Sequence, residues 1–308
     1  MFMFLALLLF SLSLSLFITA EADFLHAFEG TMTLPPPTSV LHPNTPAQAP
    51  LNPDVAFTIQ TTNTPFSEYV ESFPQHGKVE PGQHYRIENS PLLAQVENKE
   101  SDSVLIIIVF NDTESWGANR SSTDFFQLVN SFNYPKAKIS IAMLTSSIDE
   151  FTKVKKLFNR YVHDYAQLSV IFRNDFTLDD LTRDNRHDDP RQAGRRRMIA
   201  RYRNYALLST LETWHQHVLW LDADINVIPA GLLSKMAQLP LDSVGGSVLY
   251  VRADVHRQGV LFPPHYVIGS EWEAEGYDGI ETEGLCYIAH FLGFKCWGMP
   301  NDLIFHVP

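Results

Sequence analysis

The 308-residue sequence predicts an α/β protein built on a mostly parallel sheet with helices on both faces. Three apolar, partly β-branched runs, at 104–110, 138–144 and 168–172, have the continuous pattern of strands that are buried on both sides. Helical patterns at about 122–132 and 148–166 separate them. Because strands and helices alternate, the order favours a parallel sheet of Rossmann type, in which ligands bind beyond the carboxyl ends of the strands.

A fourth apolar run, Val218–Leu221, is followed by Asp222 and Asp224. Alternation along a strand places residues i and i+2 on the same side, so both carboxylates should face one target. A divalent cation is the expected reason to hold two anions together. Asp112 and the turn at 145–147 follow the first two strands, and we expect them at the same edge of the sheet.

The first 100 residues lack sustained helical or strand periodicity. Residues 1–20 are almost wholly apolar or Ser, which fits a signal-anchor and a cleaved signal peptide equally. Both alternatives address the chain to the secretory pathway, and the signal-anchor would also hold it in the membrane. Residues 21–100 are rich in Pro between Thr, Asn and Gln, which predicts a disordered stem or linker. The folded domain is therefore expected at 101–308.

The composition excludes some classes of protein. The formal net charge is -12, which argues against binding of nucleic acid. The two cysteines, Cys286 and Cys296, are too few for a disulfide framework. They are ten residues apart, so one bridge and two free thiols both remain open.

Arginines cluster near the middle of the chain. A polar segment at 174–194 predicts a loop, and its His187-Asp-Asp cluster is more typical of a solvated loop than of a metal site. Residues 191–213 then follow a helical pattern whose first half is rich in Arg. Since Arg forks match phosphate oxygens, we expect one or two of these residues to bind a diphosphate. Arg203, with Asn204 beside it, is the preferred candidate because it lies deep in the helix.

Beyond the Asp pair, the sequence predicts a helix to about residue 239 and a strand over 243–251. A last helix is expected over 282–292, after a loop rich in acidic residues. Two glycosylation sequons occur earlier, at Asn111 and Asn119. We expect Asn111 to be unmodified because it lies at the predicted ligand edge, whereas Asn119 falls in a predicted loop.

Five blocks in order resemble the fungal Golgi mannosyltransferases of the Mnn9/Van1/Anp1 family, over about residues 103–306. They lie at 195–204, 218–225, 259–263, 281–284 and 298–306. The resemblance implies a glycosyltransferase of the GT-A fold that transfers α-linked mannose, with retention, from GDP-mannose to a mannan or N-glycan acceptor on a glycoprotein. It also implies Mn²⁺ as cofactor, a lumenal catalytic domain anchored in the Golgi membrane, and association with other mannosyltransferase subunits.

The same resemblance assigns roles to the metal side of the site. Asp222 and Asp224 match the family's metal and nucleotide-sugar motif, and His306 matches a late histidine that is a candidate third ligand. A neutral imidazole beside carboxylates suits Mn²⁺ better than Mg²⁺. We therefore expect Asp224 and His306 to hold the metal, while Asp222 also orients the donor.

Other matched residues belong to the donor and acceptor. Glu281 and Glu283 match acidic residues at the sugar and acceptor end, and we expect them to be catalytic. Asp112 matches an acidic residue near the nucleotide. The chain departs from the family pattern at Val109–Phe110 and at Thr145–Ser147, which both follow strands on the nucleotide side.

Two rival functions were weighed against sugar transfer. A phosphatase with an Asp-x-Asp nucleophile is rejected, because Asn226 stands where Thr or Val is required and three strands precede the motif. A catalytically weak scaffold subunit of a mannan polymerase-like complex remains the alternative.

Overall fold

The structure is a computed structural model of the chain, and it describes residues 56–61, 65–176, 189–245, 248–265 and 279–307. Every element named below belongs to one compact unit, residues 50–308. Three predictions lie outside the described residues: the signal segment at 1–20, the stem from 21 to 55, and the role of His187. Within the described ranges, no helix combines the length and the apolarity that crossing a membrane requires.

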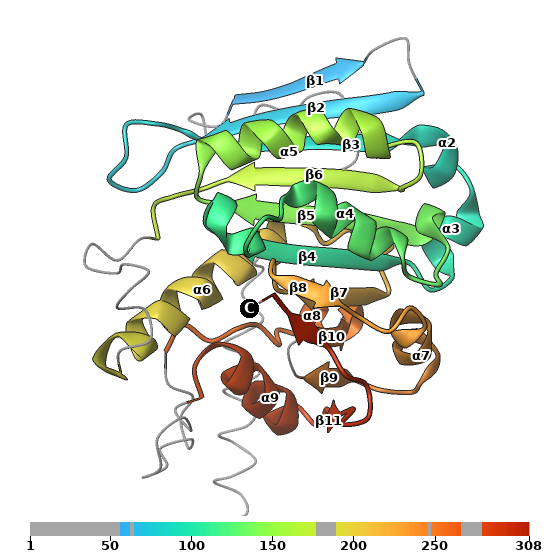
Figure 1. Cartoon of the computed structure of the whole chain (residues 1–308), viewed down its shortest axis with the longest axis vertical. Coiled ribbons are helices and arrows are strands. Elements are labelled where there is room, and N and C mark those ends of the chain that lie inside the picture. Colours follow the sequence, from blue (N-terminus) through green and yellow to red (C-terminus); the bar gives the residue numbers. More distant parts are fainter. Residues whose placement is uncertain (1–55, 62–64, 177–188, 246–247, 266–278, 308) are drawn as a thin grey trace, which may run out of the picture. The chain divides into compact units, whose positions relative to one another are not determined.

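A mixed sheet forms the centre of the unit (Figure 1). Its middle consists of four parallel strands in the order β6 (Gln167–Phe172), β5 (Ile139–Thr145), β4 (Val104–Phe110) and β7 (His217–Leu221). The predicted α/β class and parallel arrangement are therefore confirmed. Because β5 and β6 lie on one side of β4 and β7 on the other, the chain reverses its direction of progress between β4 and β7. Sheets of this kind bind ligands beside that reversal.

Antiparallel strands extend the sheet on both sides. Beyond β6 lie β3 (Gly82–Asn89), β2 (Phe66–Phe73) and β1 (Ala56–Thr61). Beyond β7 lie β10 (Val248–Arg252) and β9 (Ser243–Gly245), and the short β11 (Cys296–Gly298) pairs in parallel with β9.

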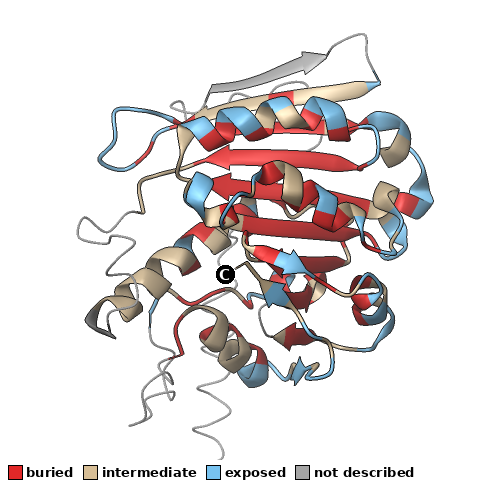
Figure 2. Cartoon of the chain, in the orientation of Figure 1, coloured by how far each residue is buried: buried red, intermediate tan, exposed pale blue. Residues whose placement is uncertain are grey.

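Helices cover both faces of the sheet, as predicted. Residues Ile106 and Ile108 of β4 point into one apolar core with α4 (Ser122–Asn130), α5 (Ile148–Tyr161) and α7 (Leu232–Gln238). Leu105 and Ile107 point into a second core with α6 (Asp189–Thr210), α8 (Ala253–Arg257) and α9 (Glu281–Phe291). Figure 2 shows these central strands buried along their length, which explains why their sequences are continuously apolar.

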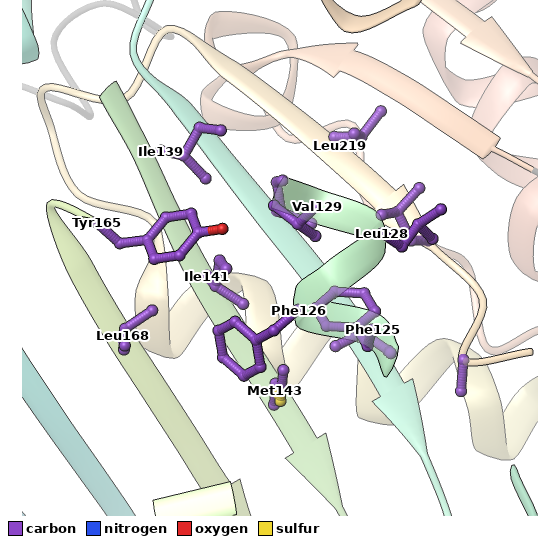
Figure 3. Packing of buried hydrophobic residues seen from close by; sticks show 14 of the residues in the cluster. Phe125, Phe126, Leu128, Val129, Ile139, Ile141, Met143, Tyr165, Leu168 and Leu219 are labelled. Atoms are coloured by element: carbon purple, nitrogen blue, oxygen red, sulfur yellow. The ribbon is translucent and has the colours of Figure 1, made fainter. Parts of the chain in front are cut away.

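Aromatic packing in the first core holds in place the segment that follows β4, which forms one wall of the cavity described below. Phe125 and Phe126 of α4 lie over the central strands of the sheet (Figure 3), and the Phe126 ring stacks on Tyr161 with centroids 4.2 Å apart. Trp116 contacts Phe125 at 6.1 Å and Phe110 at 4.5 Å between ring centroids. Full burial of such a side chain stabilises the fold by about 2–3 kcal/mol. The short 3₁₀ helix η1 (Thr113–Trp116) is thereby anchored directly after β4.

The predicted stem is wrong for residues 56–61 and 66–100. That stretch contains β1, β2 and β3, followed by the short helices α2 (Ser90–Leu93) and α3 (Val96–Glu100). Within the described part of this stretch, prolines stand at element boundaries. Pro65 precedes β2, Pro74 follows it, and Pro81 precedes β3. A proline at a strand end removes no ladder hydrogen bond, so it punctuates a sheet as readily as it stiffens a linker.

The predicted single strand at 243–251 is also wrong. Residues Ser243–Gly245 and Val248–Arg252 form separate strands, β9 and β10, which pair antiparallel with each other. Gly245 therefore ends a strand at a reversal, rather than allowing a close approach within one strand. The helix predicted at 148–166 ends earlier, at Tyr161, and a second 3₁₀ turn, η2 (Lys136–Lys138), precedes β5.

Candidate active site

A cavity of about 1000 Å³ lies at the carboxyl ends of β4, β5 and β7. Its walls come from the chain after β4 (109–115), the β5–α5 turn, the first half of α6, and the residues that follow β7. Six of the seven residues predicted for the site line it: Asp112, Arg203, Asp222, Asp224, Glu281 and His306. The cavity thus lies beside the reversal of strand order between β4 and β7, at the strand ends where the sequence placed the ligand edge.

Asp222, Asp224 and His306 form a candidate metal centre. Each offers a ligand atom, and these atoms lie within 4.8 Å of one another. His306 Nδ1 is 2.9 Å from Asp224 Oδ1. A six-coordinate ion with bonds of roughly 2.1 Å keeps its ligand atoms roughly 3–4 Å apart, so small side-chain movements would suffice to enclose one. Two carboxylate oxygens and an imidazole nitrogen are a donor set that fits Mn²⁺.

The end of the chain reaches this centre through a second, two-stranded sheet. Strand β12 (Phe305–His306) pairs antiparallel with β8 (Ile225–Val227), so that His306 lies opposite Ile225. The Val307 amide also donates to the Asp224 carbonyl at 2.9 Å. Gly117 makes room for this segment, because a Cβ at that position would lie 2.8 Å from the Val307 side chain. Short-range spacing could not reveal a ligand that comes from 82 residues downstream.

Asp222 experiences opposing electrostatic effects. Burial raises the pKa of its carboxyl above the ordinary value, and the Asp224 carboxylate raises that pKa further. The Arg203 guanidinium acts in the opposite direction and lowers it. Arg203 Nη2 lies 3.3 Å from Asp222 Oδ1. A divalent cation would stabilise the ionised form of Asp222 by the same physical effect as Arg203, only more strongly.

Arg203 joins the Asp pair to the start of α9. Its Nη1 lies 2.7 Å from Glu281 Oε1 and donates to Thr282 Oγ1, also at 2.7 Å. The guanidinium also lies over the Phe262 ring, 5.1 Å from the centroid. The sequence predicted that Arg203 would face a diphosphate. It does line the cavity, and in this structure it bridges two acidic residues there.

Glu281 adopts an unusual backbone conformation beside the cavity. Its φ is 62°, in the left-handed region that side chains other than Gly seldom adopt. Its amide donates to the Pro263 carbonyl at 2.9 Å. The close packing continues at Gly284, where a Cβ would lie 1.7 Å from the Gly279 carbonyl oxygen. Strained residues of this kind cluster at functional sites, at a cost of about 1–3 kcal/mol each.

Glu283 is not brought to the cavity. It pairs with Arg196 at 3.2 Å and accepts a weaker hydrogen bond from the Tyr287 hydroxyl. Because residues two apart on a helix do not share a face, α9 can present Glu281 or Glu283 to the cavity, but not both. The family resemblance placed both residues at the sugar and acceptor end, but it does not determine which face of the helix each side chain occupies.

Asp112 lies at the cavity edge, but it also has a structural role. It caps η1, accepting from the Glu114 amide at 3.0 Å and from the Asn111 side chain at 2.8 Å. Ser146 donates to the Asn111 side chain in turn. This network joins the two loops that follow β4 and β5. Asn111 therefore lines the cavity, and its predicted lack of glycan stays a prediction.

Two polar residues bind segments beside the cavity, and of these the sequence singled out Asn204, next to Arg203, but not Glu150. Glu150, 2% exposed, accepts hydrogen bonds from Trp116 and Lys153, at 2.9 and 2.7 Å. The Ser147-x-x-Glu150 spacing suits a helix cap, which hides this role. Asn204 pairs with the Phe262 backbone, donating to its carbonyl at 2.7 Å and accepting from its amide at 2.9 Å.

Comparison with known proteins gives a family and distant relatives. The family model described as Anp1 matches residues 83–239 and 235–266. Mannan polymerase complex subunit MNN9 of Candida albicans is 24% identical over 271 residues, which cover 59% of this chain and 71% of that protein. The mnn9 subunit of Schizosaccharomyces pombe is 22% identical and covers 71% of this chain and 90% of its own length. The mannan polymerase II complex anp1 subunit of the same yeast is 21% identical and covers 59% and 60%.

Solved structures are more remote. Mannosyltransferase PcManGT from Pyrobaculum calidifontis, in complex with GDP-Man and Mn²⁺, has a TM-score of 0.45 and 13% identity. The match covers 67% of this chain and 57% of that one. Staphylococcus aureus TarS 1–349 has a TM-score of 0.41 and 12% identity, with 67% and 60% covered. At such TM-scores these likenesses do not bear on the chemistry of the cavity.

Proposed function

The chain belongs to the Anp1 family, and on that premise we propose that it is a metal-dependent glycosyltransferase that moves mannose from GDP-mannose to a mannan or N-glycan acceptor. The observation that supports this most strongly is the convergence of Asp222, Asp224 and His306 in the cavity beyond β7. The α-linkage and retention of configuration are part of the proposal and follow from the family resemblance.

In this proposal, Asp224 and His306 hold Mn²⁺, and Asp222 completes the centre while orienting the donor. When bound, the cation acts as a Lewis acid that stabilises the charge developing on the diphosphate leaving group. Asp222 must be ionised to take part, and Arg203 favours that state by lowering its pKa. The ion pairs that Arg203 makes therefore prepare the acidic site for a cation.

The remaining cavity residues bind and orient the substrates. Lys153 and Arg195 add positive charge to the walls, which would attract phosphate oxygens. Glu281 lines the cavity at the start of α9 and would position the acceptor hydroxyl. A volume of about 1000 Å³ is at the upper end for small-molecule sites, which suits a nucleotide sugar together with part of an acceptor.

Donor identity is tested by a panel of nucleotide sugars offered to the full chain with Mn²⁺. The proposal predicts release of GDP from GDP-mannose, and loss of that release in Asp224→Asn. The exposed Asp164→Asn removes the same charge far from the cavity and should behave as wild type. The panel is decisive because Val109, Phe110 and Ser146 line the cavity and depart from the family pattern. If the protein turned over only a UDP-sugar, the assignment of GDP-mannose as the donor would be wrong.

A scaffold subunit that transfers little mannose is the second candidate. The relatives named above are subunits of mannan polymerase complexes, so we extend to this chain a place among other mannosyltransferase subunits at the Golgi membrane, with a lumenal catalytic domain. An inactive wild type with an equally inactive Asp224→Asn would favour the scaffold. Co-purification with partner subunits, unaffected by Asp224→Asn, would be its positive sign.

A further inference from the structure

Cys286 and Cys296, the two cysteines of the sequence, are brought together by α9 and β11. Cys286 lies in the middle of the helix and is half-buried, and Cys296 begins the strand and is exposed. Both thiols are free in this structure, and they are hydrogen-bonded to each other. The ten-residue spacing therefore leads to a direct contact between two sulfur atoms.

A defined turn produces this contact. Helix α9 ends in a Schellman motif, in which the Phe294 amide donates to the Ala289 carbonyl at 2.8 Å and the Gly293 amide donates to the His290 carbonyl at 3.0 Å. Gly293 has the φ of 86° that this motif needs. The turn reverses the chain, so that β11 runs back beside the helix. The approach of the two thiols is thus built into regular local structure.

The sheet fixes the second cysteine. Cys296 is the Cα partner of Ser243 in the parallel pairing of β11 with β9. The Ser243 hydroxyl donates to the Cys296 sulfur at 3.0 Å. Two donors, the Ser243 hydroxyl and the Cys286 thiol, therefore point at one sulfur. Donors of this kind stabilise a thiolate, which is the reactive form of cysteine.

We propose that Cys286 and Cys296 form a disulfide that ties α9 to the edge of the sheet. The oxidant is a low-molecular-weight disulfide, such as oxidised glutathione. The Cys296 thiolate attacks one of its sulfurs and releases one glutathione thiolate, and Cys286 then attacks Cys296 Sγ and releases the second. Two protein thiols lose two electrons, the two protons go to the two released glutathiones, and one protein disulfide is formed.

The electrostatics agree with this order of events. The hydrogen bond from Cys286 lowers the pKa of Cys296 to about 7, while the same contact raises the pKa of Cys286. Cys296 is also the more exposed of the two, so it meets the oxidant first. Cys286 is held within reach as the resolving thiol. Because α9 carries Glu281 at its other end, the bond would also restrain the helix that forms one wall of the cavity.

The test is oxidation of the full-length protein in glutathione buffers of graded redox ratio, followed by alkylation and intact-mass analysis. The proposal predicts loss of both alkylatable thiols and a monomer lighter by two hydrogen atoms. The same chain in guanidinium should need a buffer about tenfold more oxidising, since only the fold holds the thiols together. The oxidised protein should also melt about 5 °C higher than the reduced one.

Single-cysteine variants complete the design. In Cys286→Ser the remaining Cys296 should accumulate a mixed disulfide with glutathione, and in Cys296→Ser the less exposed Cys286 should do so more slowly. The proposal is overturned if both wild-type thiols stay alkylatable in the most oxidising buffer. It is also overturned if folded and denatured chains are oxidised at the same ratio, or if the bond links two chains. None of these measurements depends on glycosyltransferase activity.

Discussion

Arg203 is the positively charged residue that lies between the acidic side chains of the site. Its guanidinium lies between Asp222, at 3.3 Å, and Glu281, at 2.7 Å, with 16% of its side chain exposed. Burial and the neighbouring carboxylate raise the pKa of Asp222, and Arg203 is the cation that opposes them. Arg203 is therefore a fixed positive charge that favours the ionised form of Asp222.

Replacement of Arg203 should shift the pH at which the site binds metal. In Arg203→Gln the pKa of Asp222 rises further, so the carboxylate is protonated, and unable to bind a cation, up to a higher pH. We expect the pH midpoint of Mn²⁺ binding to move to a higher pH. The exposed Arg201→Gln, on the same helix, is the matched control and should leave the midpoint unchanged. A downward shift in Arg203→Gln would contradict this balance.

At the scale of elements, two polar clamps hold loops against helices around the cavity. Glu150 of α5 binds Thr113 and Trp116 of η1, and Asn204 of α6 binds the backbone of Phe262. Each clamp joins a helix to a loop that lines or supports the cavity. Such loops lie outside the sheet, so side chains must supply the hydrogen bonds that strands obtain from each other.

Glu150→Gln should destabilise the protein by about 1–3 kcal/mol. Thr113, Trp116 and Lys153 all donate hydrogen bonds to the Glu150 carboxylate. In the variant, the NH₂ group of the glutamine would face at least one of these donors and could not accept its hydrogen bond. Burial alone would raise the pKa of Glu150, but hydrogen bonds from Lys153, Thr113 and Trp116 lower it below its ordinary value of 4.5. The stabilisation is therefore present above pH 4.5 and is lost as the pH falls towards the lowered value.

Guanidinium unfolding of wild type and Glu150→Gln between pH 3 and 7 checks this prediction, at roughly one-unit steps around the ordinary carboxyl pKa. The two curves should converge at the acidic end. The exposed Glu97→Gln is the control and should follow wild type throughout. A difference between wild type and Glu150→Gln that is constant with pH would show that the carboxylate charge has no part in the clamp.

Asn204→Ala should loosen the segment around Phe262. It removes two hydrogen bonds and leaves a backbone amide and carbonyl unpaired beside a buried ring, at a cost of about 2 kcal/mol. Amide hydrogen exchange at Phe262 is the specific readout. Asn204→Asp retains the acceptor for that amide, so it should keep the protection that Asn204→Ala loses. Equal protection in all three proteins would exclude the clamp.

At the scale of the whole molecule, the parallel centre of the sheet was predictable from the sequence. Its strands β4, β5, β6 and β7 are buried on both faces, so each appears in the sequence as a continuous apolar run. Strands β1–β3 were missed because they contain many polar residues and are flanked by prolines, and a disordered linker has the same composition. Their loss would expose the edge of β6, so an active fragment should retain them rather than begin near residue 101.

The candidate site was predictable to the extent that the residues lie at strand ends or match the family pattern. Asp112, Asp222 and Asp224 follow strands, whereas His306 and Glu281 needed the resemblance. What the sequence could not provide is which of two acids on α9 faces the cavity, because that depends on the turn at Glu281 with its φ of 62°. Clamps such as Asn204 join segments 58 residues apart and leave no local pattern.

Buried histidines should make the whole fold sensitive to acid. His256 accepts from Trp220 at 3.3 Å and donates to the Val260 carbonyl at 2.7 Å, so its neutral form satisfies both contacts. Burial lowers the pKa of His256 to about 4 from 6.5. The unfolded chain takes up a proton below pH 6.5 and the folded chain does not, so stability is lost as pH falls through that window.

The expected loss from His256 alone is roughly 3 kcal/mol at pH 4. It should appear as the difference in pH dependence between wild type and His256→Gln, measured by guanidinium unfolding. The exposed His76→Gln should retain the full pH dependence of wild type. If His256→Gln loses stability between pH 6.5 and 4 as steeply as wild type, the histidine is not the sensor.

The central claim, that Asp222, Asp224 and His306 form a metal centre, is tested most directly by titration of the protein with Mn²⁺, followed by electron paramagnetic resonance of the free ion. The account predicts one site per chain, with affinity reduced at least about tenfold in Asp224→Asn and in His306→Gln, and unchanged in Asp164→Asn. Equal affinity in wild type and both site variants would contradict it.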